Sequence, residues 1–355
     1  MADVVREVLE AAVADGLTPG AAAAVIDRRS GVVAHWCVGA LAADEAIDGP
    51  HRVTKTTVFD LASLTKLFVT TVLVADAVDD GVIDLDEQPW PGWPGVTPRH
   101  LLAHDGGLVA HRHFYRDLLD DARRSHLLGQ RAGRDAIVDA VLATPPEAAP
   151  GARVLYSDLG FIALGALLEQ RRGREIDGLW AMHPLSDGTG ARFVRLADVG
   201  YHPALPLLAP TEHCAWRKRV VHGQVHDDNC FAMGGVGGHA GLFGSLDDVA
   251  TLVARLFTRL HDADDTLARF ASHRTASSPT RAIGFDVATP GGSTGDALSA
   301  RTVGHLGFTG TSVWFDLDAG HAYVLLSNAV HYGRDSARER SRALRVKFHQ
   351  AAARR

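Results

Sequence analysis

Two short apolar runs near the start of the chain are separated by a charged turn. Residues 21–26 are all apolar, residues 27–31 read Asp-Arg-Arg-Ser-Gly, and residues 32–38 are again mostly apolar. Two apolar runs of strand length around a polar turn are typical of a β-hairpin. The last third of the chain has the same character, with short β-rich runs bounded by Gly or Asp at residues 283–288, 302–307, 311–316 and 321–327. We therefore expect a hairpin near one end and an antiparallel meander near the other.

The middle of the chain follows a helical period instead. The segment after Ser63 places its apolar residues near one helical stripe and has no Gly or Pro before Gly81. The same period predicts helices at residues 134–143, 159–172 and 246–260, and a charged helix from Asp335 onward.

These elements predict an α+β fold. Strands at both ends of a chain usually share one sheet, so the helical middle is interpreted as an insertion. We expect an antiparallel β-sheet flanked by helices, with an inserted mainly helical subdomain. Residues 1–65 and 235–355 should form the α/β subdomain and residues 66–234 the helical one, within a single unit.

Composition narrows the possible functions. The 355 residues are 46% hydrophobic and 22% charged, with a formal net charge of −6, as in an ordinary globular protein. No basic stripe with interleaved aromatic residues is present, so nucleic acid is not an expected partner. No apolar span reaches bilayer length and no Sec-type signal is visible, so we expect no membrane partner. The three cysteines are widely spaced, which favours a reducing compartment, and we expect a cytoplasmic location.

The strongest chemical candidate is the stretch Ser63-Leu64-Thr65-Lys66. Residues three apart on a helix share a face, so the Lys66 amine should lie within reach of the Ser63 hydroxyl. A serine needs a neighbouring base to attack at neutral pH, and a lysine serves as that base only if its pKa is lowered. Unpaired N–H groups at the helix start would face developing negative charge. The alternative is a serine and a lysine that share a helix face by chance.

Two further stretches carry candidate chemistry. Tyr156-Ser157-Asp158 lies directly before an apolar helix, where the phenol could relay a proton and where Asp158 could instead simply cap the helix. His305-Leu306-Gly307-Phe308 lies at the end of a predicted strand. Glycine at 307 would let a ligand lie against the backbone, and the following N–H groups could donate to an oxyanion. The alternative is a glycine-rich hairpin with an incidental histidine.

The three motifs together, in the order SLTK, YSD and HLG, resemble those of the serine β-lactamase and penicillin-binding protein superfamily, most closely its class C-like branch. Four further segments also look like segments typical of that superfamily: PGAAAAVI, LLAHDGGL, GGVGGHAGLFGSLDDVA and GHLGFTGTSVWFDL. The resemblance therefore covers nearly the whole chain. It implies a β-lactamase/transpeptidase-like fold. It also implies that Ser63 is the acylated nucleophile, Lys66 its partner base and Tyr156 the second proton-transfer residue.

The resemblance also assigns substrate-binding residues. It implies an oxyanion hole made by the backbone N–H groups of Ser63 and Phe308, with Gly307 beside it and His305 in place of the lysine of a K-T-G element. The VHDDN segment resembles a loop near the site of class C-like relatives, so Asp227 and Asn229 are expected to touch substrate.

Two departures from the family pattern bear on the substrate. Asp158 stands where the lactamases usually carry asparagine, and His305 where they carry lysine, so an amide donor and a permanent cation are lost. We therefore expect a serine hydrolase that acts on esters or small amide or peptide-like acyl donors. A β-lactamase or DD-peptidase-like penicillin-binding enzyme and a biosynthetic acyltransferase are the alternatives. The expected partner is a small-molecule substrate, with no cofactor, and the sequence leaves the oligomeric state open.

The 19 histidines raise a different possibility, a metal hydrolase. His222, His226, Asp227 and Asp228 lie in the stretch HGQVHDD, and a second group gathers around a turn, at His100, His104, His111 and His113. However, Gly223 disfavours a helix in the first stretch, and no Glu follows the first histidine as in H-E-x-x-H. We therefore predict no metal site. A non-catalytic binding protein with this fold is expected to have lost Ser63, Lys66 or Tyr156, and all three are present.

Overall fold

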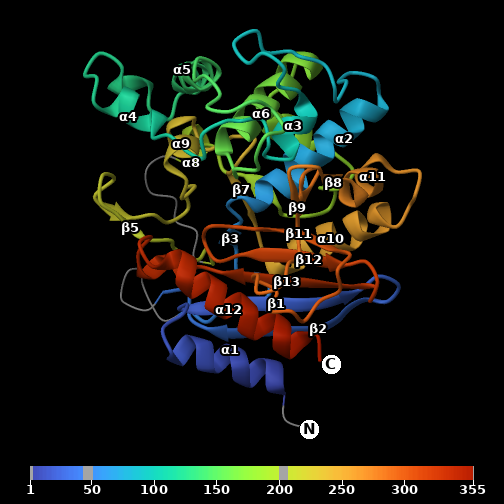
Figure 1. The fold of residues 1–355 in the computed structure, drawn as a ribbon. Helices are drawn as coiled ribbons and strands as arrows, with labels where there is room; N and C mark the ends of the chain where they lie inside the picture. Colours follow the sequence, from blue (N-terminus) through green and yellow to red (C-terminus); the bar gives the residue numbers. More distant parts are fainter. Residues whose placement is uncertain (1–2, 43–50, 200–206, 355) are drawn as a thin grey trace.

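A sheet of eight antiparallel strands runs from β2 in the lower part of the molecule to β8 near its middle (Figure 1). The computed structural model describes residues 3–42, 51–199 and 207–354. The strand order is β2-β1-β13-β12-β11-β10-β9-β8, so the first hairpin pairs directly with the last strand. The strands of this sheet are β1 (Gly20–Asp27), β2 (Gly31–Gly39), β8 (Arg274–Thr275), β9 (Ser278–Ala282), β10 (Phe285–Val287), β11 (Thr302–Leu306), β12 (Ser312–Asp316) and β13 (His321–Ser327).

Strand β1 shows why the sequence has an unbroken apolar run rather than an alternating one. Its register with β13 runs from Ala21 opposite Ser327 to Asp27 opposite His321. Ala22 and Ala24 face the large core beneath the helical region, whereas Ala21 and Ala23 face a second core on the other side. A strand that is covered on both faces needs apolar residues at every position. The predicted hairpin and meander are confirmed.

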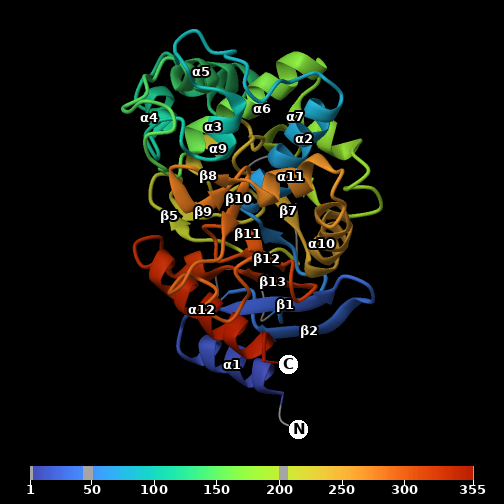
Figure 2. The ribbon, with the colours of Figure 1, turned by 45° about the vertical axis from the view of Figure 1, so that its right-hand side comes forward.

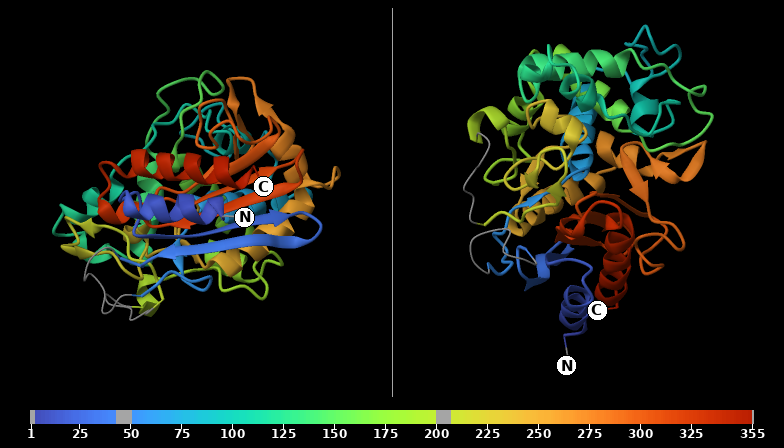
Figure 3. Two further views of the ribbon diagram at one scale, coloured as in Figure 1. Left: turned by 90° about the horizontal axis from the view of Figure 1, so that it is seen from below. Right: turned by 90° about the vertical axis from the view of Figure 1, so that its left-hand side faces the viewer.

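Two helices cover the outer face of the sheet. Helix α1 (Val4–Ala14) and helix α12 (Ala337–Ala352) lie side by side beneath the strands (Figure 3, left). The second core lies between these helices and the sheet, and it includes Val5, Leu9, Trp36, Tyr323 and Phe348. The Trp36 and Phe348 rings meet edge to face at 6.4 Å between centroids.

The helical region lies over the opposite face (Figure 2). Helix α10 (Leu246–Leu260) has the predicted bounds, because Ser245 and Asp248 form a capping box that fixes its start. The other helices of the region are α2 (Val72–Asp79), α3 (Pro98–Leu102), α4 (Phe114–Leu119), α5 (Arg131–Leu142), α6 (Asp158–Arg172), α7 (Ile176–Ala181), α8 (Leu196–Val199), α9 (Asp228–Ala232) and α11 (Thr266–Ser272). No helix in the described part of the chain is long and apolar enough to cross a bilayer.

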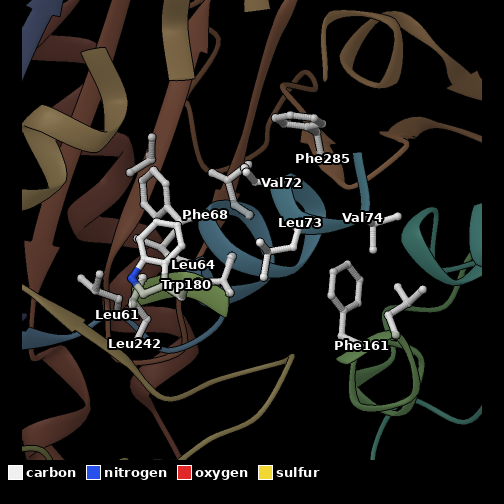
Figure 4. Close-up of a cluster of buried hydrophobic side chains, with 14 of the residues drawn as sticks. Leu61, Leu64, Phe68, Val72, Leu73, Val74, Phe161, Trp180, Leu242 and Phe285 are labelled. Carbon is white, nitrogen blue, oxygen red and sulfur yellow. The ribbon is translucent and has the colours of Figure 1, made fainter. Parts of the chain in front are cut away.

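The helix after Ser63 differs from its prediction. Residues Lys66–Thr71 form a π-helical stretch that continues into α2, and all of them are buried. The start of the helix is therefore enclosed by the core, as expected for a long buried helix, and the difference from the prediction is its π-helical turn. Figure 4 shows Leu64, Phe68 and Val72 from this helix among the aromatic rings of the core. π-Helical turns occur often at functional sites, and this one begins at a predicted site residue.

Short strands complete the structure. Strands β3 (Phe59–Asp60), β7 (Leu242–Gly244) and β4 (Arg192–Phe193) form a small second sheet, and β5 (His213–Cys214) pairs with β6 (Arg219–Val220). The sequence pattern did not predict these pairs, because strands of two or three residues have too few positions to show a period. Strand β3 ends three residues before Ser63 and so fixes the entry to the predicted nucleophile.

Candidate active site

Ser63 lies on a strained turn between β3 and the π-helical stretch. The residue before it, Ala62, has a φ of 48°, a left-handed conformation that costs free energy for a residue with a Cβ. The carboxylate of Asp60 holds this turn, since it accepts hydrogen bonds from the N–H groups of Ala62 at 2.8 Å and His226 at 2.6 Å. The strain is therefore maintained by a buried acceptor directly behind the serine.

Lys66 is hydrogen-bonded through its whole ammonium group. Its Nζ donates to Ser63 Oγ at 2.9 Å, to Asp158 Oδ1 at 2.8 Å and to the His239 carbonyl at 2.9 Å. Burial acts to lower the pKa of Lys66, but the negative charge of Asp158 and the contact with Tyr156 outweigh it and hold this pKa above its usual range. A lysine accepts the serine proton only if its pKa is lowered, so this finding contradicts the expected role of Lys66 as the base. In this state Lys66 is instead a cation that faces the serine oxygen.

Asp158 is the counter-ion of this lysine. It is the first residue of α6, and its second oxygen lies 3.1 Å from His111 Nδ1. Burial acts to raise the pKa of Asp158, but Lys66 and His111 outweigh it and hold the pKa well below its usual range, so the group is a carboxylate. The N-cap of α6 is Ser157, and its hydroxyl donates to the Val109 carbonyl at 2.7 Å. Asp158 therefore binds the lysine and does not act as the helix cap.

Tyr156 lies among basic side chains. Its ring centroid is 5.1 Å from Lys66 Nζ and 5.3 Å from the guanidinium carbon of Arg281. The His104 ring packs against it at 4.4 Å, and the His305 ring lies at 5.9 Å. The structure thus brings the SLTK, YSD and HLG motifs together, from a helix start, a loop and a strand.

His305 is enclosed rather than presented to a ligand. It is 2% exposed, and its Nδ1 donates to the Leu306 carbonyl at 2.8 Å, which leaves Nε2 as an unprotonated acceptor. Nε2 is buried and has no hydrogen-bond partner among the described residues. Burial lowers the pKa of His305 to about 3, and the charges of Lys66 and Arg281 act in the same direction. A neutral histidine without an outward donor does not replace the lysine of a K-T-G element.

Gly307 has a different role from the one expected. The turn after β11 is held against the nucleophile segment, because Thr309 Oγ1 donates to the Asp60 carbonyl at 2.8 Å and Thr311 Oγ1 to the Leu61 carbonyl at 3.2 Å. A Cβ on Gly307 would meet the Thr311 hydroxyl and would lie 2.7 Å from the Leu61 carbonyl oxygen. The space beside Gly307 is therefore filled by protein, and glycine is needed there for packing and not to admit a ligand.

The two backbone N–H groups expected to form the oxyanion hole are unengaged. Neither the Ser63 N–H nor the Phe308 N–H donates a hydrogen bond to any described residue. The Phe308 side chain is 42% exposed, and its ring stacks on His226 at 5.6 Å between centroids. Phe308 thus lies at the open side of the site, opposite the buried Lys66.

The two residues from the VHDDN segment lie in different environments. Asn229 is 1% exposed, and its amide accepts from Tyr115 N–H at 3.0 Å and donates to the Arg112 carbonyl at 2.8 Å. Both hydrogen bonds join α9 to the start of α4, so Asn229 holds the structure and the expectation that it touches substrate is wrong for this state. Asp227 caps α9 and accepts from His239 Nε2 at 3.0 Å, and its side chain is 24% exposed.

The histidines of the two clusters point to separate partners. His222 binds the Leu208 carbonyl, and His226 binds Glu212. His104 accepts from Ser157 N–H, and His100 binds Thr97. Within residues 3–42, 51–199 and 207–354, no three His, Cys, Asp or Glu side chains are grouped as metal ligands would be.

Sequence reasoning missed three residues around the site, His111, His239 and Arg281. The sequence suggests His111 only as a metal ligand, whereas in the structure its ring binds Asp158. His239 contributes its carbonyl to Lys66 and its ring to Asp227, and Arg281 lies over Tyr156. Of these, only His239 had a signal, since it lies within the GGVGGHAGLFGSLDDVA segment.

The fold, and the meeting of the SLTK, YSD and HLG motifs within it, are those of a serine hydrolase of the β-lactamase and penicillin-binding protein type. The sequence matches the family described as Beta-lactamase over residues 5–347, so the chain belongs to the β-lactamase family. A putative D-alanyl-D-alanine carboxypeptidase of Escherichia coli (strain K12) is 27% identical over 328 residues, which cover 80% of this chain and 72% of that protein.

Solved structures show the same fold at lower identity. EstCE1, a hydrolase with promiscuous acyltransferase activity, aligns with a TM-score of 0.67 and 21% identity over 97% of each chain. Unliganded simvastatin synthase (LovD) from Aspergillus terreus aligns with a TM-score of 0.68 and 19% identity over 99% of this chain and 98% of that chain. The predicted family and fold class are confirmed.

Proposed function

We propose that this protein is a serine hydrolase that forms an acyl-enzyme on Ser63 and prefers simple esters or small uncharged acyl donors. One observation carries the proposal: the Lys66 ammonium donates to Ser63 Oγ at 2.9 Å from a fully buried position. A buried cation at hydrogen-bond distance stabilises the serine oxygen as it gains negative charge. The unengaged N–H groups of Ser63 and Phe308 would then receive the oxyanion of the tetrahedral intermediate.

The proton of Ser63 requires another acceptor, because Lys66 already carries its own. We assign a relay to Tyr156, whose ring lies 5.1 Å from Lys66 Nζ. Ser63 Oγ bonds to the carbonyl carbon and gives its proton to the phenolic oxygen, whose own proton passes to the ester oxygen of the substrate. The bond from the carbonyl carbon to that oxygen then breaks and the group leaves as an alcohol, so Tyr156 ends the step as a neutral phenol. Lys66 stays an ammonium throughout. Water then attacks the acyl-enzyme, and the same relay runs in reverse.

The charges around the site favour an ester over a substrate that carries a carboxylate. His305 is neutral and buried, and Arg281 is already paired with Asp286. Asp158 is a carboxylate and offers no donor to a substrate amide. A β-lactam or a peptide with a terminal carboxylate therefore lacks one charge-assisted contact to its carboxylate, worth about 1.5–3 kcal/mol, and one neutral hydrogen bond to its amide, worth about 0.5–1.5 kcal/mol.

The second candidate is a D-alanyl-D-alanine carboxypeptidase, the activity named for the Escherichia coli relative. Arg281 supports it, because this cation lies 5.3 Å from the Tyr156 ring and would face a peptide carboxylate if Asp286 released it. An acyltransferase is a third possibility, and adding an alcohol acceptor to the same assay measures transfer against hydrolysis.

The nucleophile is tested by intact-mass detection of an adduct after exposure to p-nitrophenyl acetate, and separately to a penicillin. We expect an acetyl adduct on the wild type and none on Ser63→Ala, together with a loss of at least about 10³-fold in turnover. Ser157→Ala is the matched control, because its hydroxyl also lies in a site motif but is bound to the Val109 carbonyl. Wild-type turnover in Ser63→Ala would refute the proposal.

Substrate preference is tested by comparing kcat/KM for p-nitrophenyl acetate, nitrocefin and a peptide ending in D-Ala-D-Ala. We expect the order ester, then peptide, then nitrocefin. A preference for the peptide that disappears in Arg281→Gln would establish the second candidate instead. A preference for nitrocefin would make the protein a β-lactamase.

A further inference from the structure

A cavity lined partly by α12 lies apart from Ser63. It has a volume of about 280 Å³, and its lining residues come from strands β9 to β12, from α12 and from the loop after β10. Ser63, Lys66 and Tyr156 do not line it. Its lining combines an apolar wall, including Val287, Leu306 and Trp314, with four arginines, Arg281, Arg338, Arg342 and Arg345.

Three of these arginines lack a counter-ion. Within the described residues, no carboxylate lies at ion-pair distance from Arg338, Arg342 or Arg345, whereas Arg281 pairs with Asp286. Arg338 and Arg342 are exposed at positions one helical turn apart on α12. Three guanidinium groups around one cavity therefore leave an excess of positive charge that the protein itself does not neutralise.

The cavity also contains buried donors without acceptors. Arg345 is 6% exposed and Trp314 is 3% exposed, yet Arg345 Nε and Trp314 Nε1 have no hydrogen-bond partner among the described residues. A buried N–H group without an acceptor destabilises a fold, so such groups are uncommon unless a ligand or water completes them. Burial without a nearby carboxylate lowers the pKa of Arg345 to about 10, and an anion in the cavity would offset that cost.

We propose that this cavity is a binding site for a small organic phosphate. The planar guanidinium fork matches phosphate oxygens, and three unpaired arginines match a dianion better than a single carboxylate. The apolar wall beside them gives room for a small aromatic or aliphatic group on the phosphate. Arg338 and Arg342 lie at the entrance, and Arg345 and Trp314 lie at the buried end.

Hydrogen bonds connect the arginine-lined cavity to the turn that carries Phe308. Arg345 donates to the Gly307 carbonyl at 2.6 Å and to the Thr311 carbonyl at 2.9 Å, and these residues flank the turn that carries Phe308. Arg281 lines the cavity and also lies over Tyr156. A phosphate that draws Arg345 or Arg281 toward itself would therefore shift the turn and the tyrosine together. This coupling rests on the proposed function, whereas the binding site does not.

Binding is tested by isothermal titration of phenyl phosphate into the wild-type protein and variants. The double variant Arg338→Gln/Arg342→Gln should bind at least about tenfold more weakly, because two charge-assisted contacts are lost. Lys347→Gln is the matched control, since it removes one cation from the same helix without lining the cavity, and it should change binding less than about twofold. Benzyl alcohol, which lacks the phosphate, should not bind.

Several results would overturn the proposal. Absence of binding to the wild type would do so, as would equal loss in Lys347→Gln and in the double variant. Loss in His111→Ala with full binding by the double variant would place the phosphate in the catalytic site. The coupling is measured separately as turnover of p-nitrophenyl acetate with saturating phenyl phosphate, where we expect a change of at least about threefold that the double variant abolishes. Unchanged turnover with intact binding would refute the coupling alone, and a protein without esterase activity would refute the proposed function but leave the binding result valid.

Discussion

The two walls of the site differ in how their polar groups are satisfied. On the helical wall, Lys66 is saturated by Ser63, Asp158 and the His239 carbonyl, and both charges of the ion pair are firmly held. On the strand wall, His305 is neutral and its Nε2 has no partner in the described chain. The helical wall thus contains a buried ion pair, whereas His305 on the strand wall is uncharged.

This difference teaches which substrates the site can hold. A balanced cation–anion pair beside the nucleophile serves a reaction that develops negative charge on oxygen. A strand wall without a free cation gives no anchor to a carboxylate. The two walls together therefore support attack on a carbonyl without selecting an anionic substrate.

Lys66→Met tests the difference between the two walls most strongly, and it should have the largest effect. This change removes the charge that faces Ser63 and leaves Asp158 without its main counter-ion. We expect kcat for p-nitrophenyl acetate to fall at least about 10³-fold and the free energy of unfolding to fall by about 3 kcal/mol. The double variant Lys66→Met/Asp158→Asn should regain the stability but not the activity. Urea unfolding and steady-state kinetics measure both, and a double variant as active as the wild type would contradict the role of the charge.

Asp158→Asn should change the substrate specificity and the pH profile, with a smaller loss of kcat than Lys66→Met. The new amide gains a donor for a substrate amide, so the ratio of kcat/KM for nitrocefin over ester should rise about tenfold. Since Asp158 is the main group that raises the pKa of Lys66, its loss should move an alkaline limb due to Lys66 to lower pH. Asp227→Asn is the control, because Asp227 does not bind Lys66. An unmoved alkaline limb in Asp158→Asn would argue against Lys66 as its origin.

His305→Asn should change how stability depends on pH. In the unfolded chain His305 takes up a proton near its ordinary pKa of 6.5, whereas in the folded protein burial delays this to about 3. Between these values the unfolded state binds more protons, so the wild type loses stability as the pH falls, by up to about 1.4 kcal/mol per pH unit from this residue. His305→Asn should flatten that fall.

The control for this measurement is His349→Asn. Burial lowers the pKa of His349 to about 4, and its ring lies beneath the sheet beside Phe348. His349→Asn should reduce the loss of stability at acid pH over a narrower pH range than His305→Asn, and it should leave kcat/KM unchanged. Equal acid sensitivity in His305→Asn and the wild type would mean that His305 is charged in the folded protein.

Among the predicted site residues, Asn229 should affect catalysis least when it is replaced by alanine. Its two hydrogen bonds join α9 to α4, so we expect a loss of about 1–3 kcal/mol in stability with kcat and KM within about twofold of the wild type. Chemical unfolding and ester kinetics on the same preparation separate the two effects. A tenfold rise in KM at unchanged stability would return Asn229 to substrate binding.

The sequence predicted the local features of the site and missed those that depend on distant contacts. The spacing of Ser63 and Lys66 is set by one helical turn, so their contact followed from the sequence. The pKa of Lys66 did not, because it depends on Asp158, 92 residues away along the chain. Likewise, α10 could be bounded by its own capping box, whereas the two-residue strands exist only through their partners.

The resemblance to family motifs predicted which residues lie near the site, but it did not predict where their side chains point. Asn229 and His305 lie where the family pattern puts them, but Asn229 binds the start of α4, and His305 is buried beside Tyr156 with its Nδ1 on the Leu306 carbonyl. Gly307 was correctly singled out as a place of close approach, but the approaching group is the Leu61 carbonyl. Such directions depend on packing, which a linear pattern does not contain.

Strand β1 is synthesised long before β13, the strand with which it pairs. The two partners lie about 300 residues apart in the chain, so at about 5–20 residues per second the ribosome needs roughly 15–60 s to supply the second after the first. During that interval the alanine-rich β1 and its hairpin partner have no neighbour on their open side. The turn that brings Phe308 to Ser63 lies between β11 and β12, so it is also made late in synthesis. The nascent chain therefore carries its nucleophile long before the rest of the catalytic site emerges, and a chaperone that shields the exposed edge of β1 would act in that period.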